Sequence, residues 1–367
     1  MEFTFSMPVK VYFGKGCIDK NSSVIAAAGK KALIVTGKSS ADKNGSLKQV
    51  LDALAKEKIS NERFNRVEAN PSVETVREAG QMARDVKADF IIGIGGGSPL
   101  DAAKAIAILA TNDLDDETLF SGVYKNRPLP LIAVPTTAGT GSEVTPYSIL
   151  TFRKISNKKS IASPEIFPVA AFLDATFTET LPIDTTINTA VDALSHTVEG
   201  YLSARATDVI APIAIESMRL LGISLKKLTD KSTPSFSERE NLLYASMLAG
   251  MVIAHTGTTA VHAMGYPLTY HRDIDHGRAN GLLMYGYLRF LEPASPKVKN
   301  VINAMGLKDV EEFGKLIEAL LGKREEVTDE EIELFTDTAM TSKNIANTLP
   351  APARDEVKKI FQLSFGR

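Results

Sequence analysis

The histidines are the residues of this chain best suited to metal chemistry. The chain has five of them, and four fall between His255 and Gly281, namely His255, His262, His271 and His276. The fifth, His196, follows Asp192 by four residues in a run rich in helix formers, so both side chains can share one helix face. Imidazoles and a carboxylate together suit a borderline divalent metal such as Zn²⁺ or Fe²⁺. The spacing predicts one metal held by two helical segments, although ordinary surface or core histidines could give the same pattern.

A glycine-rich loop follows an apolar run at Phe90–Ile94. Gly95, Gly96 and Gly97 would let the backbone approach a ligand closely, and Ser98 is predicted to cap a helix that begins at Pro99, with Asp101 at the capping-box position. A helix start at the end of a parallel strand exposes N–H groups that suit a diphosphate. The alternative is a plain tight turn, since the loop is neither a G-x-G-x-x-G nor a Walker A motif.

A hydroxyl-rich loop follows the next apolar run, at Leu131–Val134. Five hydroxyl side chains stand here among glycines: Thr136, Thr137, Thr140, Ser142 and Thr145. Such small donors and acceptors fit ribose and a nicotinamide amide, and the position after a neighbouring strand favours a ligand shared with the glycine loop. An ordinary polar loop is the alternative.

Bulk composition excludes several classes of protein. The chain has 367 residues, 44% of them hydrophobic and 23% charged, which is typical of a globular protein with two domains. The net charge of −2 and the lack of a basic tract argue against nucleic acid or an anionic membrane as partners. The single cysteine, Cys17, excludes an internal disulfide. No signal peptide or membrane-spanning run is visible, so we expect a cytoplasmic protein.

Strand and helix patterns alternate through the first half of the chain. Apolar strands are predicted at Phe3–Phe13, Lys31–Thr36, Ile59–Val67, Ala88–Ile94 and Leu131–Val134, with helices between them at Ser46–Lys56, after an N-cap at Ser72, and at Pro99–Ala110. This order predicts a doubly wound α/β domain with a parallel sheet, spanning residues 1–181.

The second half, residues 182–367, reads as all-helical. Helical patterns are predicted at 183–202, 208–228, 237–254, 258–266, 278–291, 297–304, 309–320 and 328–365, the last with a break at Leu349–Pro352. No convincing strand follows Pro182. A cleft between two such domains is a favoured place for a ligand.

Five motifs together resemble the iron-containing (group III) alcohol dehydrogenases. They are Gly95–Asp101, Pro135–Thr145, Asp192–Glu199, His262–Met264 and His276–Gly277, in this order. The likeness extends from the first strands to about residue 290. It implies a Rossmann-like dinucleotide-binding domain and a helical metal-binding domain, the dehydroquinate synthase-like architecture.

The resemblance also implies roles for individual residues. Asp192, His196, His262 and His276 would ligate the metal, Fe²⁺ or alternatively Zn²⁺, and would act in catalysis through it. The cofactor would contact both loops, at Gly95, Gly96, Gly97, Ser98, Asp101, Thr136, Thr137, Thr140, Ser142 and Thr145, and also Pro71, Tyr147, Lys158 and Leu181. Lys158 stands five residues before Ser163, as in the family, although Lys159 is an alternative match.

One position departs from the family pattern. Many members carry a second histidine four residues after the first, thought to relay a proton, and this chain has Tyr266 there. We expect either Tyr266 or His271, which is predicted to lie in a polar loop, to take that role. His255 is predicted to be a polar cleft or core residue, because Gly257 to Thr259 should break the helix after it.

Cofactor choice depends on the loop after the first α/β strand. Members of the family that prefer NAD tend to carry an acid there, which would repel a 2′-phosphate, whereas this chain has Gly37, Lys38, Ser39 and Ser40. A cation and two hydroxyls could hold that phosphate by charge-assisted hydrogen bonds. The loop therefore predicts a preference for NADP(H) over NAD(H), and the alternative is a simple turn.

These expectations describe a metal-dependent alcohol dehydrogenase or aldehyde reductase. The metal would polarise the alcohol oxygen while the nicotinamide accepts a hydride. A small primary alcohol or diol is expected as substrate, in a pocket that includes Tyr147, Leu181 and Tyr266, and a homodimer is implied by resemblance, with the Phe3–Phe13 strands as an interface edge. The alternatives are a glycerol-dehydrogenase-like or dehydroquinate-synthase-like enzyme, or a nucleotide-sensing or structural protein with a vestigial site.

Overall fold

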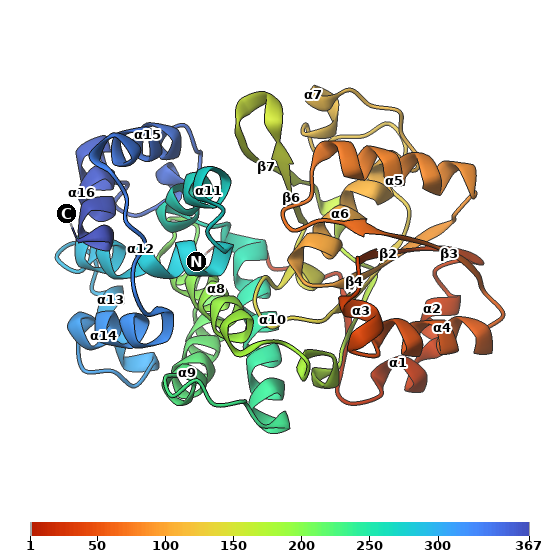
Figure 1. Cartoon of the computed structure of the whole chain (residues 1–367), viewed down its shortest axis with the longest axis horizontal. Coiled ribbons are helices and arrows are strands. Elements are labelled where there is room, and N and C mark those ends of the chain that lie inside the picture. Colours follow the sequence, from red (N-terminus) through yellow and green to blue (C-terminus); the bar gives the residue numbers. More distant parts are fainter. Residues whose placement is uncertain (1, 367) are drawn as a thin grey trace. The chain divides into compact units, whose positions relative to one another are not determined.

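The computed structural model describes residues 2–366, and its contacts divide the chain into two compact units (Figure 1). The N-terminal unit consists of Ser6–Thr137 and Gly141–Leu181. The helical unit consists of Met1–Phe5, Ala138–Thr140 and Pro182–Arg367.

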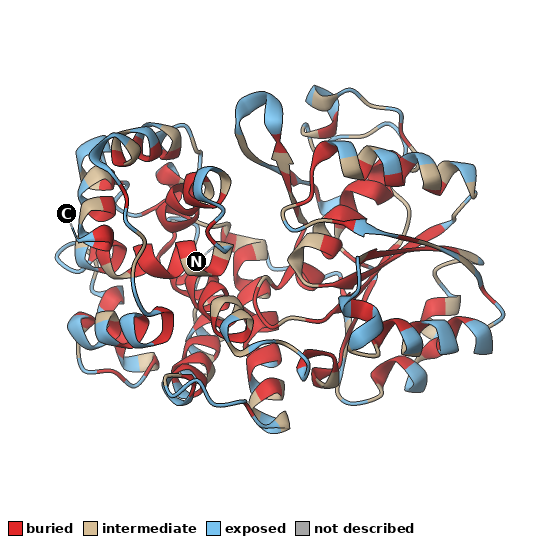
Figure 2. Ribbon diagram, in the orientation of Figure 1, coloured by how far each residue is buried: buried red, intermediate tan, exposed pale blue. Residues whose placement is uncertain are grey.

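The N-terminal unit is built on a six-stranded sheet in the order β1-β8-β5-β4-β2-β3, in which every pair of neighbouring strands is parallel. The strands are β1 (Lys10–Phe13), β2 (Lys31–Gly37), β3 (Ser60–Val67), β4 (Phe90–Gly95), β5 (Leu131–Pro135) and β8 (Ala170–Leu173). The central strands β2, β4 and β5 are almost wholly buried, as strands covered on both faces must be (Figure 2). The predicted doubly wound parallel sheet is confirmed.

Helices cover both faces of this sheet because strand side chains alternate between the faces. On one face, Leu33 and Val35 pack in a cluster with α5 (Val73–Asp85), α6 (Gly97–Leu109) and α7 (Asp116–Leu119). On the other, Ile34 packs in a cluster with α1 (Cys17–Lys20), α2 (Ser22–Ala26), α3 (Ser40–Lys43) and α4 (Ser46–Lys56).

A two-stranded antiparallel hairpin, β6 (Tyr147–Phe152) and β7 (Asn157–Ala162), follows β5. The sequence predictions included neither this hairpin nor β8. The predicted strand at Phe3–Phe13 is shorter than expected, since pairing begins only at Lys10 and the segment before it forms no strand.

Within residues 183–366 the helical unit contains nine α-helices and no strand. They are α8 (Ile183–Leu202), α9 (Ala211–Leu228), α10 (Phe236–Thr256), α11 (Ala260–Arg272), α12 (His276–Leu291), α13 (Lys297–Ala304), α14 (Val310–Leu321), α15 (Asp329–Met340) and α16 (Arg354–Phe365). Helix α8 is buried along its whole second half, and α12 packs against it with Gly277 and Gly281 at the contact (Figure 2). None of the helices in the described part of the chain is long and apolar enough to cross a membrane.

Residues at the helix ends determine where several helices begin or stop, and two predictions of such residues are correct. Ser72 caps α5, with its hydroxyl accepting a hydrogen bond from the Thr75 N–H group. Helix α10 ends at Thr256, where Gly257 has a φ of +66°, so the predicted break before Thr259 is confirmed.

Two predicted ends are wrong. Helix α6 begins at Gly97 with Gly96 as its N-cap, so Ser98 lies inside the first turn and does not cap the helix. His271 is in the last turn of α11 rather than in a loop, because that helix continues to Arg272 and stops at Asp273, whose φ is +51°.

Candidate active site

Three of the predicted ligands form a buried cluster. Asp192 and His196 lie one turn apart on α8, and His262 lies in the first turn of α11. One potential ligand atom from each of the three lies within 4.8 Å of the other two. The His196 and His262 rings stack with centroids 4.7 Å apart, and all three side chains are buried. This is a donor set of two imidazoles and one carboxylate, shielded from water.

His276, the first residue of α12, lies beside this cluster. Its Nε2 atom and that of His262 are each 3.9 Å from Oδ1 of Asp192. One turn later on α12, the buried side-chain amide of Asn280 donates a hydrogen bond to Oδ1 of Asp192 over 3.0 Å. The same amide nitrogen lies 3.2 Å from Nε2 of His262 and 3.3 Å from Nε2 of His276. Asn280 therefore ties the carboxylate to both imidazoles.

Glu199 fixes the orientation of His262 from the opposite side of its ring. This carboxylate is fully buried on α8 and bonds Nδ1 of His262. It also accepts from the N–H groups of Thr259 and His262 and from the Thr259 hydroxyl, over 2.8, 3.2 and 2.8 Å. With Nδ1 engaged as the donor, the lone pair of Nε2 faces Asp192 and the ligand cluster.

The charge states of the cluster suit a metal. Burial opposes ionisation of Asp192, but His196, His276 and His262 around it hold its pKa below the usual range. Burial also lowers the pKa of His196, which favours the neutral ligand form of the ring. Nδ1 of His196 is buried and has no hydrogen-bond partner within residues 2–366. The residues present thus fit a divalent metal such as Fe²⁺ or Zn²⁺.

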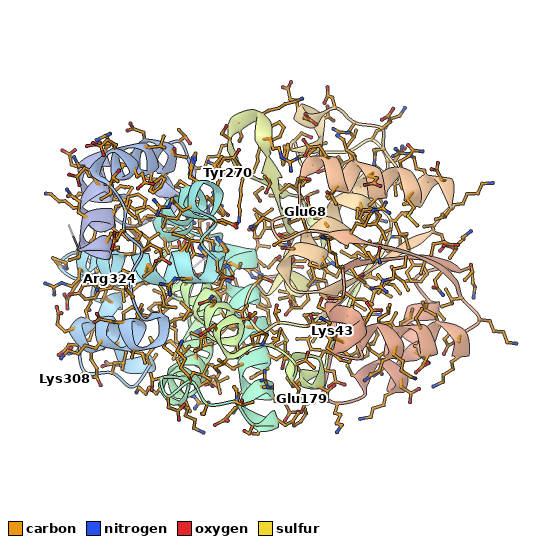
Figure 3. The ribbon with its side chains drawn as sticks, in the orientation of Figure 1. Lys43, Glu68, Glu179, Tyr270, Lys308 and Arg324 are labelled. Atoms are coloured by element: carbon orange, nitrogen blue, oxygen red, sulfur yellow. The ribbon has the colours of Figure 1, made fainter. Side chains whose placement is uncertain are left out.

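The two relay candidates lie in different surroundings. The Tyr266 ring stacks on His276 with centroids 5.7 Å apart and meets His262 edge-on at 6.2 Å. His271 is exposed, and its ring stacks on Phe335 at 5.9 Å, next to Tyr270, which Figure 3 labels. His255 stacks on Phe5 at 4.6 Å and is not part of the metal cluster.

The glycine loop and the hydroxyl loop are adjacent in the N-terminal unit. Gly95 pairs with Pro135 across β4 and β5, and the N–H group of Thr136 donates to the Gly95 carbonyl over 2.9 Å. A Cβ atom at Gly96 would lie 3.0 Å from Oγ1 of Thr137, so glycine leaves room for the threonine side chain. Gly96, Gly97, Ser98 and Thr137 follow the carboxyl ends of these two strands and are partly exposed.

Several polar residues of the two loops bond to one another around a buried lysine. Nζ of Lys104, on α6, donates to the Ser142 and Thr145 hydroxyls and to the Tyr147 carbonyl, over 2.8, 3.1 and 2.7 Å. The carboxylate of Asp101 accepts from the Ser142 hydroxyl over 2.6 Å and from the Ile149 N–H group over 3.0 Å. These contacts give Asp101, Ser142 and Thr145 a role in holding the hydroxyl loop against α6.

Asn70 connects the glycine loop to the hairpin. Its N–H group donates to Oγ of Ser98 over 3.1 Å, and its side-chain oxygen accepts from Nζ of Lys158 over 2.7 Å. The carbonyl of the next residue, Pro71, accepts from the Thr151 N–H group over 2.8 Å. Glu68, labelled in Figure 3, accepts hydrogen bonds from Ser72 and thereby supports this turn.

The residues predicted to select the cofactor lie after β2. Gly37 ends that strand and is partly exposed, and Lys38, Ser39 and Ser40 are exposed. Leu181, at the end of the N-terminal unit, is partly exposed, and its N–H group donates to the Thr178 carbonyl over 3.1 Å.

Three residues of the hydroxyl loop, Ala138–Thr140, belong to the helical unit. A Cβ atom at Gly139 would lie 2.7 Å from Cβ of Thr189, on α8 one turn before Asp192. This part of the loop therefore contacts the same helix that carries two of the metal-cluster residues.

Sequence reasoning missed three residues of the site: Glu199, Asn280 and Lys104. Each had a signal in its spacing, since Glu199 and Asn280 stand three and four residues after His196 and His276, on a neighbouring turn of the same helix. Lys104 similarly stands three residues after Asp101. Spacing alone could not predict their roles, because each of them bonds a residue of another segment of the chain.

Comparisons with known proteins agree with this geometry. A family model described as iron-containing alcohol dehydrogenase matches residues 8–175, and one described as the C-terminal domain of the Fe-containing alcohol dehydrogenase family matches residues 186–365. The chain is 30% identical to long-chain-alcohol dehydrogenase 1 of Geobacillus thermodenitrificans, over 98% of this chain and 95% of the relative. It is 36% identical to 1,3-propanediol dehydrogenase of Citrobacter freundii, over 83% of this chain and 79% of the relative.

Among solved structures, an iron-containing alcohol dehydrogenase from Thermotoga maritima superposes with a TM-score of 0.93 at 40% identity, covering 100% of both chains. The matched regions include both units and every residue of the metal cluster. The chain therefore belongs to the iron-containing alcohol dehydrogenase family, and it is an alcohol dehydrogenase with a metal site at Asp192, His196 and His262.

Proposed function

We propose that this enzyme interconverts a small primary alcohol or diol and its aldehyde, with NADP(H) preferred over NAD(H). One observation carries the proposal. The hydroxyl loop, expected to hold the nicotinamide, contributes Ala138–Thr140 to the helical unit, where Gly139 packs against Thr189, one turn before the cluster residue Asp192 on α8. A loop that serves both a dinucleotide and a metal is what hydride transfer to a nicotinamide requires.

His276 is proposed as the fourth metal ligand, because its Nε2 atom lies as close to Asp192 as that of His262 does. Bound there, Fe²⁺, or alternatively Zn²⁺, would act as a Lewis acid toward the oxygen of the substrate. The protein's part is to hold the carboxylate through Asn280 and the His262 ring through Glu199.

Tyr266 is proposed to move the proton that the alcohol oxygen loses or gains. Its ring stacks on His276, which keeps the phenol beside the ligand cluster. His271 remains the second candidate, although its exposed ring packs on Phe335.

The cofactor is proposed to lie along the ends of β2, β4 and β5, as ligands do in open parallel sheets. In this proposal Gly95–Ser98 receive the diphosphate, while Thr136, Thr137 and Thr140 receive the nicotinamide half. Pro71, Lys158 and the network of Asp101, Ser142, Thr145 and Tyr147 support these contacts, and Leu181 closes the site. Gly37, Ser39 and Ser40 receive the 2′-phosphate of NADP(H).

The substrate class is proposed as small and fairly apolar. The names of the relatives support an alcohol as the substrate but do not indicate one chain length. One relative is a long-chain-alcohol dehydrogenase and another is a 1,3-propanediol dehydrogenase. A cytoplasmic homodimer is also proposed. Edge strand β1, which pairs with β8, would provide the interface.

The function is tested by following NADPH oxidation with a panel of short aldehydes on anaerobically purified protein supplied with Fe²⁺ or Zn²⁺. We expect turnover of at least one short aldehyde and a higher kcat/KM with NADPH than with NADH. Absence of turnover with every metal would contradict the proposed reaction.

Cofactor preference is tested by Gly37→Asp. A Cβ atom at Gly37 would come no closer than 3.6 Å to its nearest neighbour, the Val67 carbonyl, so the position has room for a side chain. The new carboxylate should repel the 2′-phosphate and shift the kcat/KM ratio toward NADH. Gly37→Ala is the matched control for bulk, and an unchanged ratio in Gly37→Asp would remove this loop from the phosphate site.

A further inference from the structure

The loop proposed to receive the 2′-phosphate is followed by an acid. Asp42, on α3, comes two residues after Ser40, and no other acid occurs between Lys31 and Lys43. Figure 3 labels Lys43 at the end of this short helix. The Asp42 side chain is 47% exposed. An unpaired carboxylate so near the loop would repel a phosphate dianion.

Asp42 is paired with Arg63, a residue of the neighbouring strand β3. Two parallel hydrogen bonds join the guanidinium to the carboxylate, Nη1 to Oδ1 over 2.9 Å and Nη2 to Oδ2 over 2.6 Å. This bidentate geometry is the strong form of an arginine–carboxylate pair. Arg63 also holds the pKa of Asp42 below its usual value, so the acid stays ionised and depends on this pairing for neutralisation.

The guanidinium is anchored to the loop itself. Nε and Nη2 of Arg63 donate to the hydroxyl of Thr36 over 3.1 and 3.0 Å, and that hydroxyl donates to the Gly37 carbonyl over 2.8 Å. Thr36 is fully buried, and the Arg63 side chain is 24% exposed. The arginine thus has a fixed position between the base of the loop and the nearest acid.

We infer that Arg63 is a specificity-determining residue, which neutralises Asp42 so that the Gly37–Ser40 loop can accept the 2′-phosphate of NADP(H). The inference rests on the proposed NADP(H) preference. It predicts that loss of the guanidinium weakens binding of NADPH but not of NADH, because only NADPH carries the phosphate that Asp42 would repel.

The test is an equilibrium titration of the full-length protein with NADPH and with NADH, followed by cofactor fluorescence without substrate. Arg63→Met should raise the Kd of NADPH roughly threefold to tenfold, a screened single-charge effect, and change that of NADH by less than about twofold. Arg63→Lys, which retains a cation, should keep most of the NADPH preference. Adding Asp42→Asn to Arg63→Met should restore the Kd of NADPH to within about twofold of the wild type.

The matched control is Arg66→Met, on the same strand, where the arginine pairs with the exposed Glu78. It should leave the ratio of the two Kd values unchanged. Equal weakening of both cofactors by Arg63→Met, or failure of the double variant to recover, would overturn the charge-neutralising role. A wild-type protein that binds NADPH no more tightly than NADH would instead refute the proposed preference, so the two failures are distinguishable.

Discussion

Single residues around the metal cluster act mainly by orienting the ligands. Asn280 bonds the Asp192 carboxylate and Glu199 bonds the His262 imidazole, and neither residue is itself part of the cluster. Partners of this kind fix the tautomer and rotamer of a ligand before the metal arrives. The order of the cluster thus depends on two buried residues outside it.

Glu199→Gln tests this role. The amide keeps the shape of the side chain but removes the negative charge that makes His262 a stronger ligand, so we expect Zn²⁺ affinity to fall by about tenfold or more. A chromophoric chelator in competition for the metal measures the affinity directly. Glu143→Gln is the control, because that buried acid lies in the N-terminal unit. Wild-type affinity in Glu199→Gln would show that the contact serves packing alone.

At the scale of elements, close packing of α8 against α12 brings His276 toward Asp192. The packing depends on Gly277, where a Cβ atom would lie 1.9 Å from the Asn188 carbonyl oxygen and 3.0 Å from Cβ of Asp192. Any side chain there must push the two helices apart.

Gly277→Ala should therefore lower the free energy of unfolding by about 1–3 kcal/mol or more, and should weaken metal binding as well. Urea unfolding of the metal-free protein and Zn²⁺ titration give the two readouts. The control is Gly37→Ala, where the nearest atom to an added Cβ lies 3.6 Å away. Unchanged stability and affinity in Gly277→Ala would mean that the helices adjust without cost.

The network between α6 and the hydroxyl loop makes stability depend on pH. Burial raises the pKa of Glu143 to about 7 from a usual 4.5, and burial lowers that of Lys104 to about 8. Since the folded state holds the Glu143 proton more tightly than the unfolded state, the resulting stabilisation is complete below pH 4.5 and is lost as the pH rises through 7.

Glu143→Gln removes this dependence. Relative to the wild type, the variant should gain about 1–3 kcal/mol of stability as the pH rises from 4.5 to above 7. Urea unfolding across this range measures the difference, and the same substitution at the exposed Glu117 controls for the loss of a formal charge. A difference that stays constant with pH would contradict a buried, proton-holding Glu143.

Helices and strands with a regular pattern of apolar residues could be predicted from the sequence, and those without one could not. The helices of the second half followed from apolar periodicity, and the central strands from continuous apolar runs. The β6–β7 hairpin was missed because β7 has only one buried residue and contains Asn157, Lys158, Lys159 and Ser160, which resemble a loop. Ser98 was predicted to cap α6, but Gly96 is the N-cap of that helix. The Ser98 hydroxyl instead accepts a hydrogen bond from the N–H group of Asn70, and because the two residues are 28 apart, no local sequence pattern signals this bond.

In the whole molecule, the division into two units does not fall at a single point of the sequence, as the predicted boundary at residues 181 and 182 implied. Two short segments far from the helices in sequence, Met1–Phe5 and Ala138–Thr140, belong to the helical unit. Phe5 stacks on His255 and Gly139 contacts α8. No periodicity in these segments could have predicted such contacts, because each depends on where another part of the chain lies.

We expect the buried metal site at Asp192, His196 and His262 to perform the chemistry. The most direct test compares metal content and aldehyde reduction in wild-type protein, in His262→Ala and in His255→Ala, all purified anaerobically with Fe²⁺. His262→Ala should lose both bound metal and activity, while His255→Ala, which removes a ring packed on Phe5 outside the cluster, should keep both. A His262→Ala protein that retains its metal and its turnover would show that the chemistry does not depend on this site.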